Sequence, residues 1–121
     1  MRRRIGGMCV GIVALVFVAS IPASAGAATL YATVGPGYTI SLATPSGTPV
    51  RTIAAGRVFD VVVRDRSAHH NFRLTGPGFT RQTSVAFAGT TRPWRVTFTA
   101  GRWSYVCSPH SLTMKGTVTV R

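Results

Sequence analysis

Apolar and polar residues alternate with a period of two, and not 3.6, along most of the chain beyond residue 28. In residues 94–100 and again in residues 102–107, large apolar side chains occupy every second position. Five further stretches are rich in valine, isoleucine, threonine and aromatic residues: Thr29–Val34, Thr39–Ala43, Val58–Val63, Asn71–Leu74 and Gly116–Val120. These patterns predict short β-strands with one face buried.

Residues that favour turns separate the predicted strands. They are Gly35-Pro36-Gly37, Pro45-Ser46-Gly47, Ala55-Gly56, Gly76-Pro77-Gly78, Gly89 and Ala100-Gly101. Seven to eight short strands divided in this way predict an all-β fold, an antiparallel β-sandwich. Only Thr80–Ala88 has a pattern that a short helix could adopt. Because no repeat or linker interrupts the chain, we expect residues 28–121 to form one domain.

The charge of the chain is strongly basic. Its 121 residues include 14 lysines and arginines but only two acidic residues, Asp60 and Asp65, and the formal net charge is +12. Hydrophobic residues make up 45% of the chain, which excludes a disordered basic tail. Two carboxylates are too few for paired-carboxylate catalysis or for a calcium or magnesium cage. The composition therefore argues against most hydrolase mechanisms.

The first 27 residues have the features of a secretory signal peptide. Arg2–Arg4 precede an apolar run, Met8–Ala19, and small residues at 23–27 offer a cleavage site. An uncleaved anchor remains open, because Ile5–Ile21 is close to the lower length limit of about 17 residues for a membrane-spanning helix. We expect residues 1–27 to direct export, so that the protein is secreted or lies in the periplasm or cell envelope.

Candidate chemistry is concentrated near the C-terminal end. Removal of the signal peptide takes Cys9 with it and leaves Cys107 as the only thiol, which cannot form an internal disulfide. Cys107, His110 and Met114 lie within eight residues at the end of a predicted strand, and Pro109 stiffens the loop between them. A thiolate, an imidazole and a thioether are soft or borderline ligands, and together they favour copper.

A trigonal copper site needs a second histidine from elsewhere in the chain, and His69 and His70 are the candidates. His70 shares its strand face with Phe72 and Leu74, whose side chains must point to the core. His69 and Asn71 are then expected to face outward. Zinc could use a cysteine and two histidines with water, but zinc has no use for the thioether. Copper is the better fit.

The pattern Cys107-x2-His110-x3-Met114, with His70-Asn71 upstream, resembles the type 1 (blue) copper site of the cupredoxins, the group of plastocyanin, amicyanin and pseudoazurin. The resemblance implies a cupredoxin-like Greek-key β-sandwich. It also implies that His70, Cys107 and His110 are the strong ligands of one copper ion and that Met114 is the long axial ligand. Asn71 would connect the two ligand loops by hydrogen bonds.

The resemblance extends over Val58–Arg121. Gly101–His110 is similar to the plastocyanin strand that enters the ligand loop, and Met114–Val120 is similar to the amicyanin strand that leaves it. One departure concerns the loop itself. Three residues separate His110 from Met114, where plastocyanin and pseudoazurin have four and amicyanin has two. The length of this segment sets where the axial sulfur lies.

The function implied by the resemblance is one-electron transfer between redox partner proteins, with His110 as the electron port inside an apolar rim of Pro36, Pro109 and Leu112. A copper-binding module that delivers the ion in the envelope remains the alternative. We do not expect an enzyme. His110 is too close in sequence to Cys107 to align as its base, and His69 alone cannot build a second metal centre.

The basic excess bears on the partners of the protein. It could steer an acidic redox partner or hold the protein near anionic polymers of the envelope. We expect no nucleic acid partner, because the chain has no nucleic-acid motif. After cleavage we expect a monomer without a membrane span, which could still associate with the envelope surface.

Overall fold

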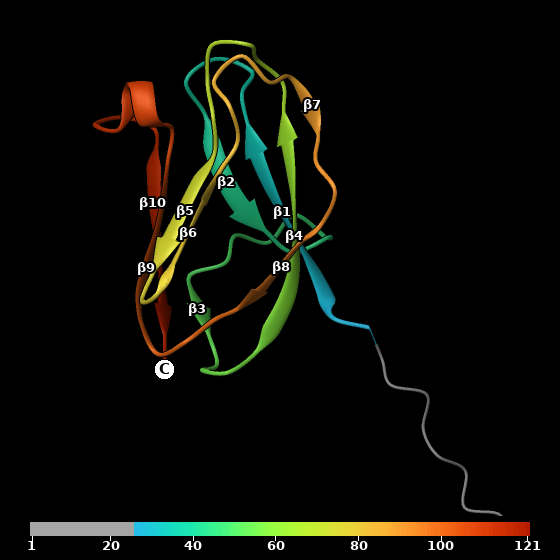
Figure 1. Ribbon diagram of the computed structural model, residues 1–121, viewed down its shortest axis with the longest axis vertical. Coiled ribbons are helices and arrows are strands. Elements are labelled where there is room, and N and C mark those ends of the chain that lie inside the picture. The colour runs from blue at the N-terminus through green and yellow to red at the C-terminus, as the bar shows by residue number, and fades with distance from the viewer. Residues whose placement is uncertain (1–25) are drawn as a thin grey trace, which may run out of the picture.

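The computed structural model describes residues 26–121, which form ten strands and one short helical turn (Figure 1). In chain order the strands are β1 (Ala28–Val34), β2 (Ile40–Ala43), β3 (Thr52–Ile53), β4 (Val58–Asp65), β5 (Arg73–Gly76), β6 (Phe79–Gln82), β7 (Gly89–Thr90), β8 (Trp94–Thr97), β9 (Gly101–Val106) and β10 (Lys115–Val120). The helical turn, η1 (Ser108–His110), lies between β9 and β10. The strands form two sheets that face each other, which confirms the predicted β-sandwich.

The first sheet has the strand order β2-β1-β4-β7, and β8 also pairs with β4. β1 and β4 run parallel, with Ala28 opposite Phe59 and Val34 opposite Asp65. β1 and β2 are antiparallel and joined by a tight turn, which Gly35 closes by donating its N–H to the carbonyl of Thr39 at 2.8 Å. This register places the turn after β1 beside the loop that follows β4.

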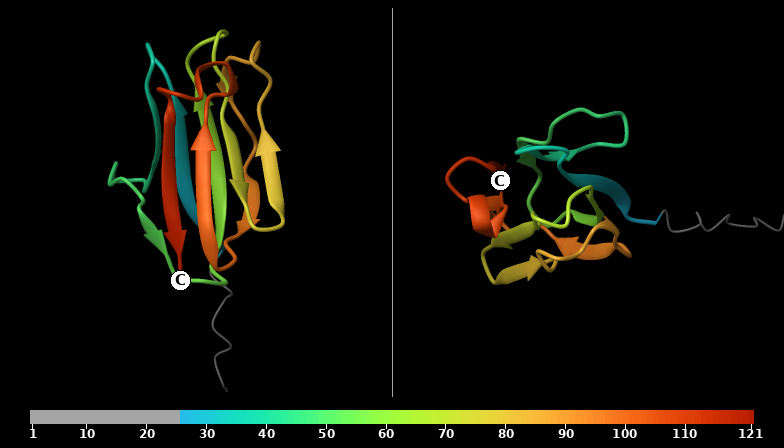
Figure 2. Two further views of the ribbon diagram at one scale, coloured as in Figure 1. Left: turned by 90° about the vertical axis from the view of Figure 1, so that its left-hand side faces the viewer. Right: turned by 90° about the horizontal axis from the view of Figure 1, so that it is seen from above.

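The second sheet has the strand order β3-β10-β9-β5-β6. β10, β9, β5 and β6 are antiparallel neighbours, whereas β3 pairs with β10 in parallel. In Figure 2, left, this sheet faces the viewer and η1 lies across its upper end. The loop before β5 and the loop after β9 therefore leave the sheet at the same end, since β5 and β9 are antiparallel partners.

The core fills the space between the two sheets with alternate side chains from each strand. The largest fully buried side chains are Trp103, Phe72, Phe98, Leu30, Leu42, Leu74, Met114, Val34, Val61, Val63, Val96 and Val118. Each buried aliphatic or aromatic side chain stabilises the fold by about 1.5–3 kcal/mol relative to its exposed state. The alternation in the sequence thus specifies which face of each strand meets the other sheet.

Trp103 shows how closely the core is packed. It is fully buried, and its indole Nε1 donates to the carbonyl of Thr99 at 2.9 Å. A Cβ atom at Gly76 would lie 2.1 Å from the indole ring, so only glycine fits at this position in β5. Gly116 in β10 meets the same restriction, because a Cβ there would lie 2.2 Å from the ring of Tyr105.

The structure differs from the sequence expectations in two details of secondary structure. The structure has ten strands and not seven to eight, because β3 and β7, of two residues each, are too short to show a period. Thr80–Ala88, the segment that could have held a short helix, is not helical. The two-residue turn Pro77-Gly78, with Gly78 at φ 71°, forms a hairpin that pairs Phe79–Gln82 with β5. The remainder of that segment forms turns and bends.

The expected signal peptide occupies residues 1–27, and residues 1–25 lie outside the described part of the chain. Within residues 26–121, no helix has both the length and the apolar character needed to cross a membrane.

Candidate metal centre

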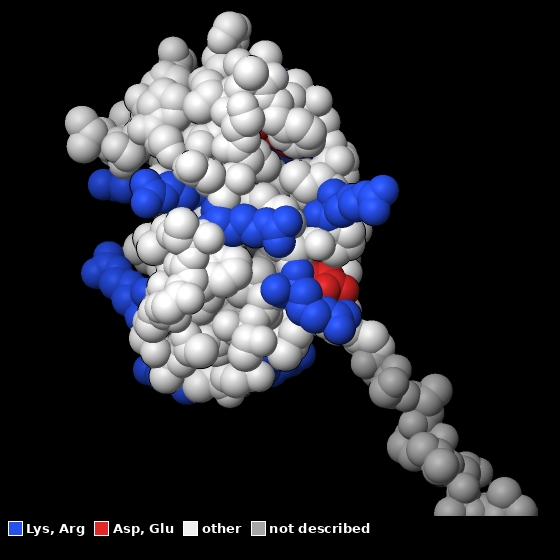
Figure 3. Space-filling model, in the orientation of Figure 1, with Lys and Arg blue, Asp and Glu red and all other residues white. Residues whose placement is uncertain are grey.

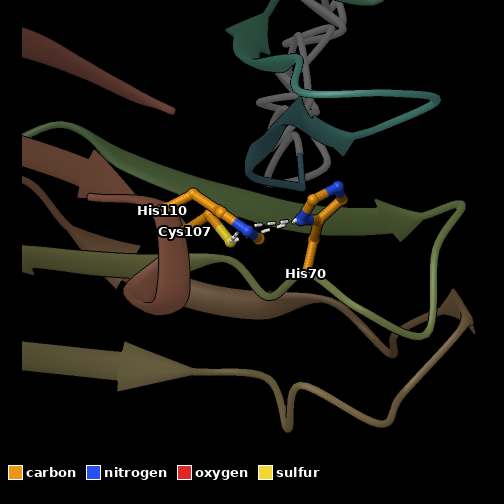
Figure 4. Close-up of side chains that lie close together, drawn as sticks. All are labelled: His70, Cys107 and His110. Atoms are coloured by element: carbon orange, nitrogen blue, oxygen red, sulfur yellow. Dashed lines mark hydrogen bonds between the residues drawn. The ribbon is translucent and has the colours of Figure 1, made fainter. Parts of the chain in front are cut away.

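Three of the four predicted ligands belong to the loop after β9. Cys107 directly follows β9, His110 ends η1 and Met114 precedes β10. His70 lies 37 positions before Cys107, in the loop between β4 and β5. Because β5 and β9 are neighbours, the two loops meet at one end of the sandwich, and the side chains of His70, Cys107 and His110 point toward one another (Figure 4).

The ligand atoms of these three residues form a small triangle. Nδ1 of His70 and Nδ1 of His110 are 3.1 Å apart, and Sγ of Cys107 lies 3.7 Å from the first and 3.5 Å from the second. Cys107 is fully buried and His70 is 5% exposed, whereas His110 is half-buried. The triangle is therefore closed to solvent except along the ring of His110.

These separations fit one metal ion. Trigonal bonds of about 2.0 Å to nitrogen and about 2.3 Å to thiolate, as at zinc, separate two nitrogens by about 3.5 Å and nitrogen from sulfur by about 3.7 Å. The distances in the chain differ from these values by a few tenths of an ångström. Within residues 26–121, the three atoms make no hydrogen bond except to one another. Two imidazoles and a thiolate are ligands that suit copper.

Met114 is fully buried at the end of the same loop. Its carbonyl accepts a hydrogen bond from the N–H of Cys107 at 3.0 Å, and its own N–H donates to the carbonyl of His110 at 2.8 Å. The N–H of His110 in turn donates to the carbonyl of Cys107 at 3.0 Å. The backbone of the loop thus closes on itself and fixes the spacing of these three residues.

Asn71 joins the two loops through its side-chain amide. Its Oδ1 accepts from the N–H of Ser108 at 2.7 Å, and its Nδ2 donates to Oγ of Ser108 and to the carbonyl of Thr83, each at 3.2 Å. The prediction that Asn71 faces outward was wrong, because the residue is 2% exposed. The strand β5 begins only at Arg73, so strand alternation does not extend back to Asn71.

Two side-chain turns shape the approach to His70. Oδ1 of Asp65, at the end of β4, accepts from the N–H of Ser67 at 3.0 Å, and Oγ of Ser67 accepts from the N–H of His69 at 3.2 Å. Burial raises the pKa of Asp65 above its usual value, although the Ser67 hydrogen bond and the nearby His70 act in the opposite direction. Its Oδ2 is buried without a hydrogen-bond partner among the described residues. His69 is exposed and lies outside the ligand triangle, as the strand pattern predicts.

Tyr38 is the residue of this end that sequence reasoning missed. Its ring lies edge-on to both ligand imidazoles, with centroid distances of 5.5 Å to His70 and 5.0 Å to His110. The tight turn after β1 holds Tyr38 there, although its side chain is 69% exposed. The sequence signal was an aromatic residue directly after Gly35-Pro36-Gly37, which placed it in a turn but did not show which loop the turn meets.

Exposed apolar side chains occur on the His110 loop and on the turn after β1. Leu112 is 87% exposed, and Pro36 and Pro109 are exposed as well. On the face that Figure 3 shows, Lys and Arg side chains form a band across the middle and lie near the lower end, with almost none at the upper end, where η1 lies in Figure 1. Below this surface, the ring of Phe72 stacks on Tyr105 at 5.6 Å, so the interior beside the ligands is also apolar.

The sequence profile described as "Copper binding proteins, plastocyanin/azurin family" matches residues 33–121. This match covers every residue of the ligand triangle. The chain belongs to this family of copper-binding proteins. Membership confirms the resemblance to the cupredoxins, and together with the His70–Cys107–His110 triangle it assigns one copper ion, at a type 1 site, as the cofactor. No curated protein sequence matches the chain.

Solved structures show the same fold at low sequence identity. Reduced rusticyanin matches with a TM-score of 0.59 and 21% identity over 82% of this chain and 82% of that chain. Rusticyanin from Thiobacillus ferrooxidans matches with a TM-score of 0.56 and 22% identity over 77% of this chain and 76% of that chain. A chain of a haem–copper terminal oxidase dimer matches with a TM-score of 0.55 and 20% identity over 77% of this chain and 63% of that chain. The protein is therefore similar in fold to these rusticyanin structures and to this chain of the oxidase dimer.

Proposed function

We propose that the protein carries single electrons between redox partners, with one copper ion held by His70, Cys107, His110 and Met114. The observation that carries this proposal is the triangle of two Nδ1 atoms and one Sγ atom in a largely buried setting. Copper bound there supplies a centre that alternates between Cu(I) and Cu(II) and so takes up and releases one electron. In this proposal Met114 would hold the copper ion through its thioether as a fourth ligand, because its side chain is buried at the end of the same loop.

The residues around the ligands keep them in one arrangement. The backbone hydrogen bonds of the loop 107–114 fix the positions of Cys107 and His110, and Asn71 fixes that loop to the segment carrying His70. A ligand set that cannot rearrange needs little reorganisation when the oxidation state changes, which favours fast electron transfer. Asn71 thus acts on the metal through the position of the ligands.

His110 is the electron port in this proposal. It is the most exposed of the three triangle residues, and the ring of Tyr38 lies edge-on to it. We assign Leu112, Pro36 and Pro109, which are all exposed, to an uncharged rim around it. A small apolar surface with few hydrogen bonds suits a short-lived redox encounter, in which the partners exchange quickly. The partner would receive the electron through the edge of the imidazole ring.

We do not include catalysis in the proposed function. Within residues 26–121, His70, Cys107 and His110 form the one group of three or more histidine, cysteine or acidic residues placed to hold a metal. His69 alone does not supply the ligands of a second centre where a substrate could bind. The proposed role is therefore transfer of electrons, with no bond made or broken in a substrate.

The proposed setting is outside the cytoplasm. The basic and apolar pattern of residues 1–27 supports export through a cleaved signal peptide, and residues 28–121 would then form the mature domain. The excess of arginine supports a redox partner with an acidic surface, reached by a monomer without a membrane span.

The decisive experiment is the absorption spectrum of the purified protein after Cu(II) loading. A type 1 site gives an intense visible band from charge transfer between the Cys107 thiolate and Cu(II), together with a reversible reduction potential. We expect this band in the parent protein and its complete loss in Cys107→Ser. A colourless protein that binds Cu(I) tightly but cannot be cycled would instead favour copper delivery.

The port is tested separately from the metal. Leu112→Asp should slow electron self-exchange about tenfold, because a charge in the apolar surface disfavours close approach of two molecules. Val58→Asp is the matched control, since Val58 is exposed at the start of β4, at the opposite end from the ligand loops. Equal rates for Leu112→Asp and the parent protein would show that electrons leave by another route.

A further inference from the structure

The outer face of the second sheet carries a row of hydroxyl groups. Register places Thr117 opposite Ser104, Ser104 opposite Thr75 and Thr75 opposite Thr80, so the four residues cross four strands in one line. Oγ1 of Thr75 and Oγ1 of Thr80 are 3.0 Å apart, which places both on the same face. The next row along the strands contains the buried Trp103 and Val118, so the hydroxyl row points away from the core.

Three basic side chains flank this row on the same face. Arg73 and Lys115 both lie opposite Val106, two residues from the hydroxyl row on one side, and Arg102 lies two residues from it on the other side. Strand geometry separates Arg73 from Lys115 by about 10 Å and Arg102 from their row by about 13 Å. We call Arg73, Arg102, Lys115 and the four hydroxyl residues the Thr/Arg face.

The charges of the Thr/Arg face are free, whereas those of the first sheet are partly used. On the first sheet, Arg95 pairs with Asp60 at 3.3 Å, and the guanidinium of Arg64 lies 3.6 Å from the ring centroid of Tyr31. Among the described residues, the exposed side chains of Arg73, Arg102 and Lys115 make no ion pair, hydrogen bond or contact with an aromatic ring.

No acidic side chain lies on the second sheet. The two acidic residues of the chain, Asp60 and Asp65, both belong to β4 in the first sheet. The potential over the Thr/Arg face is therefore positive without internal compensation, and the face complements an anionic partner.

The composition of the face indicates the kind of anion. Its side chains offer hydroxyl and cationic donors on a sheet surface, and the exposed large hydrophobic residues, Tyr38, Val58, Val85 and Leu112, all lie outside it. Val106, between Arg73 and Lys115, is only half-buried, but it is not a large exposed anchor, and a face without such an anchor is poorly suited to insertion into a lipid bilayer. Regularly spaced acidic and hydroxyl groups, as in an acidic polysaccharide, match two cations about 10 Å apart, Arg73 and Lys115, with a row of hydroxyls between them and Arg102.

We propose that the Thr/Arg face binds a linear acidic polysaccharide. In Figure 2, left, the second sheet presents this face to the viewer, while η1 and the ligand loop occupy the upper end. A polymer lying on the sheet therefore leaves the surface around His110 free for a redox partner. The binding does not depend on copper, because none of the three basic residues is a proposed ligand.

The test measures the affinity of the copper-loaded and the copper-free protein for polygalacturonate, a polymer of acidic sugars. We compare the parent with the triple variant Arg73→Gln, Arg102→Gln, Lys115→Gln and with a control triple variant, Arg57→Gln, Arg64→Gln, Arg92→Gln. Both variants lose three positive charges. At low salt, the Kd of the first variant should be at least about tenfold higher than that of the parent. The slope of its log Kd against the logarithm of the salt concentration should be smaller than the parent's by about two to three. The control should change little.

Several outcomes would overturn the proposal. Equal weakening in both triple variants would show that net charge, and not this face, governs binding. Equal affinity for neutral dextran would exclude a charge-based site. Binding to vesicles of phosphatidylglycerol and phosphatidylcholine that exceeds binding to polygalacturonate would assign the face to a lipid surface. Unchanged thermal unfolding of each variant ensures that the comparison concerns folded proteins. Because copper-free protein is included, failure here is distinguishable from failure of the proposed electron transfer.

Discussion

Residues 107–114 and residues 66–72 bring ligands to the same end of the sandwich, but different interactions hold the two segments. The segment 107–114, the C-terminal ligand loop, is closed by its own backbone through four hydrogen bonds. The segment 66–72, the His70 loop, is braced by side chains: Asp65, Ser67, Asn71 and Thr83 all bond to backbone groups within it or beside it. Substitutions that spare the ligands should therefore affect the His70 loop far more than the C-terminal ligand loop.

The largest effect is expected from Asn71→Ala. The substitution leaves the N–H of Ser108 and the carbonyl of Thr83 without their partners, and unpaired buried groups cost about 1–3 kcal/mol each. We expect the free energy of unfolding of the copper-free protein to fall by about 2–3 kcal/mol in chemical denaturation. The variant Asn71→Asp keeps the acceptor for Ser108 and should lose less. A loss within 0.5 kcal/mol, about that of an ordinary surface substitution, would contradict the bracing role.

A smaller loss is expected from Thr83→Val. Oγ1 of Thr83 accepts from the N–H of Phe72 at 3.0 Å in a buried position, and valine preserves the shape without the acceptor. We expect a loss of about 1–2 kcal/mol in the same measurement. Thr83→Ser retains the hydroxyl and is the matched control, so similar losses in both variants would point to packing and not to the hydrogen bond.

Asp65 should make a smaller contribution that depends on pH. Burial raises its pKa above the usual 3.8, so the folded protein holds the proton more tightly than the unfolded chain. The resulting stability is complete below pH 3.8 and is lost as the pH rises through the raised pKa. Asp65→Asn cannot titrate, and its unfolding free energy should fall less than that of the parent between pH 4 and pH 7. Parallel pH profiles for the two copper-free proteins would refute this assignment.

The smallest effects are expected in the C-terminal ligand loop. Ser111→Ala and Thr113→Ala remove exposed hydroxyls but no backbone hydrogen bond of the loop. The contact that Thr113 loses, from Oγ1 to the carbonyl of His110 at 3.4 Å, is long and exposed. Unfolding free energies should stay within about 0.5 kcal/mol of the parent, and the visible absorption band should not move. Losses as large as that of Asn71→Ala would remove the distinction between the two loops.

This distinction also explains what could be predicted from the sequence. The spacing of Cys107, His110 and Met114 is a local property of the chain. The backbone of the loop closes on itself after a strand, so their presence in one short loop could be predicted from the sequence. His70 is buried, as the strand pattern predicted, but Asn71 and Phe72 are buried as well, because these residues precede β5 and do not alternate. The conformation of the His70 loop depends on partners distant in sequence, so the burial of Asn71 could not be read from alternation.

The features that sequence reasoning missed also depend on contacts between segments that are distant in the sequence. Tyr38 reaches the ligand imidazoles because β1 and β4 run parallel, which sets the turn after β1 beside the His70 loop. No local pattern reports a parallel pairing between strands so far apart. The possible helix at Thr80–Ala88 does not form for a similar reason, since pairing with β5, and not local preference, makes its first residues, Thr80–Gln82, part of strand β6.

The two parallel pairings have a further consequence for the order of assembly. β1 joins β4, and β3 joins β10, over long separations in the sequence, and neither pairing can be made by a hairpin. Closure of such distant contacts costs chain entropy before it gains stability, and sandwiches dominated by them fold in milliseconds to seconds. The ligand triangle depends on both β4 and the β9–β10 hairpin, so it should form late in folding. Copper capture would then report completion of the native topology, and a stopped-flow comparison of metal uptake with tryptophan burial would follow the two events separately.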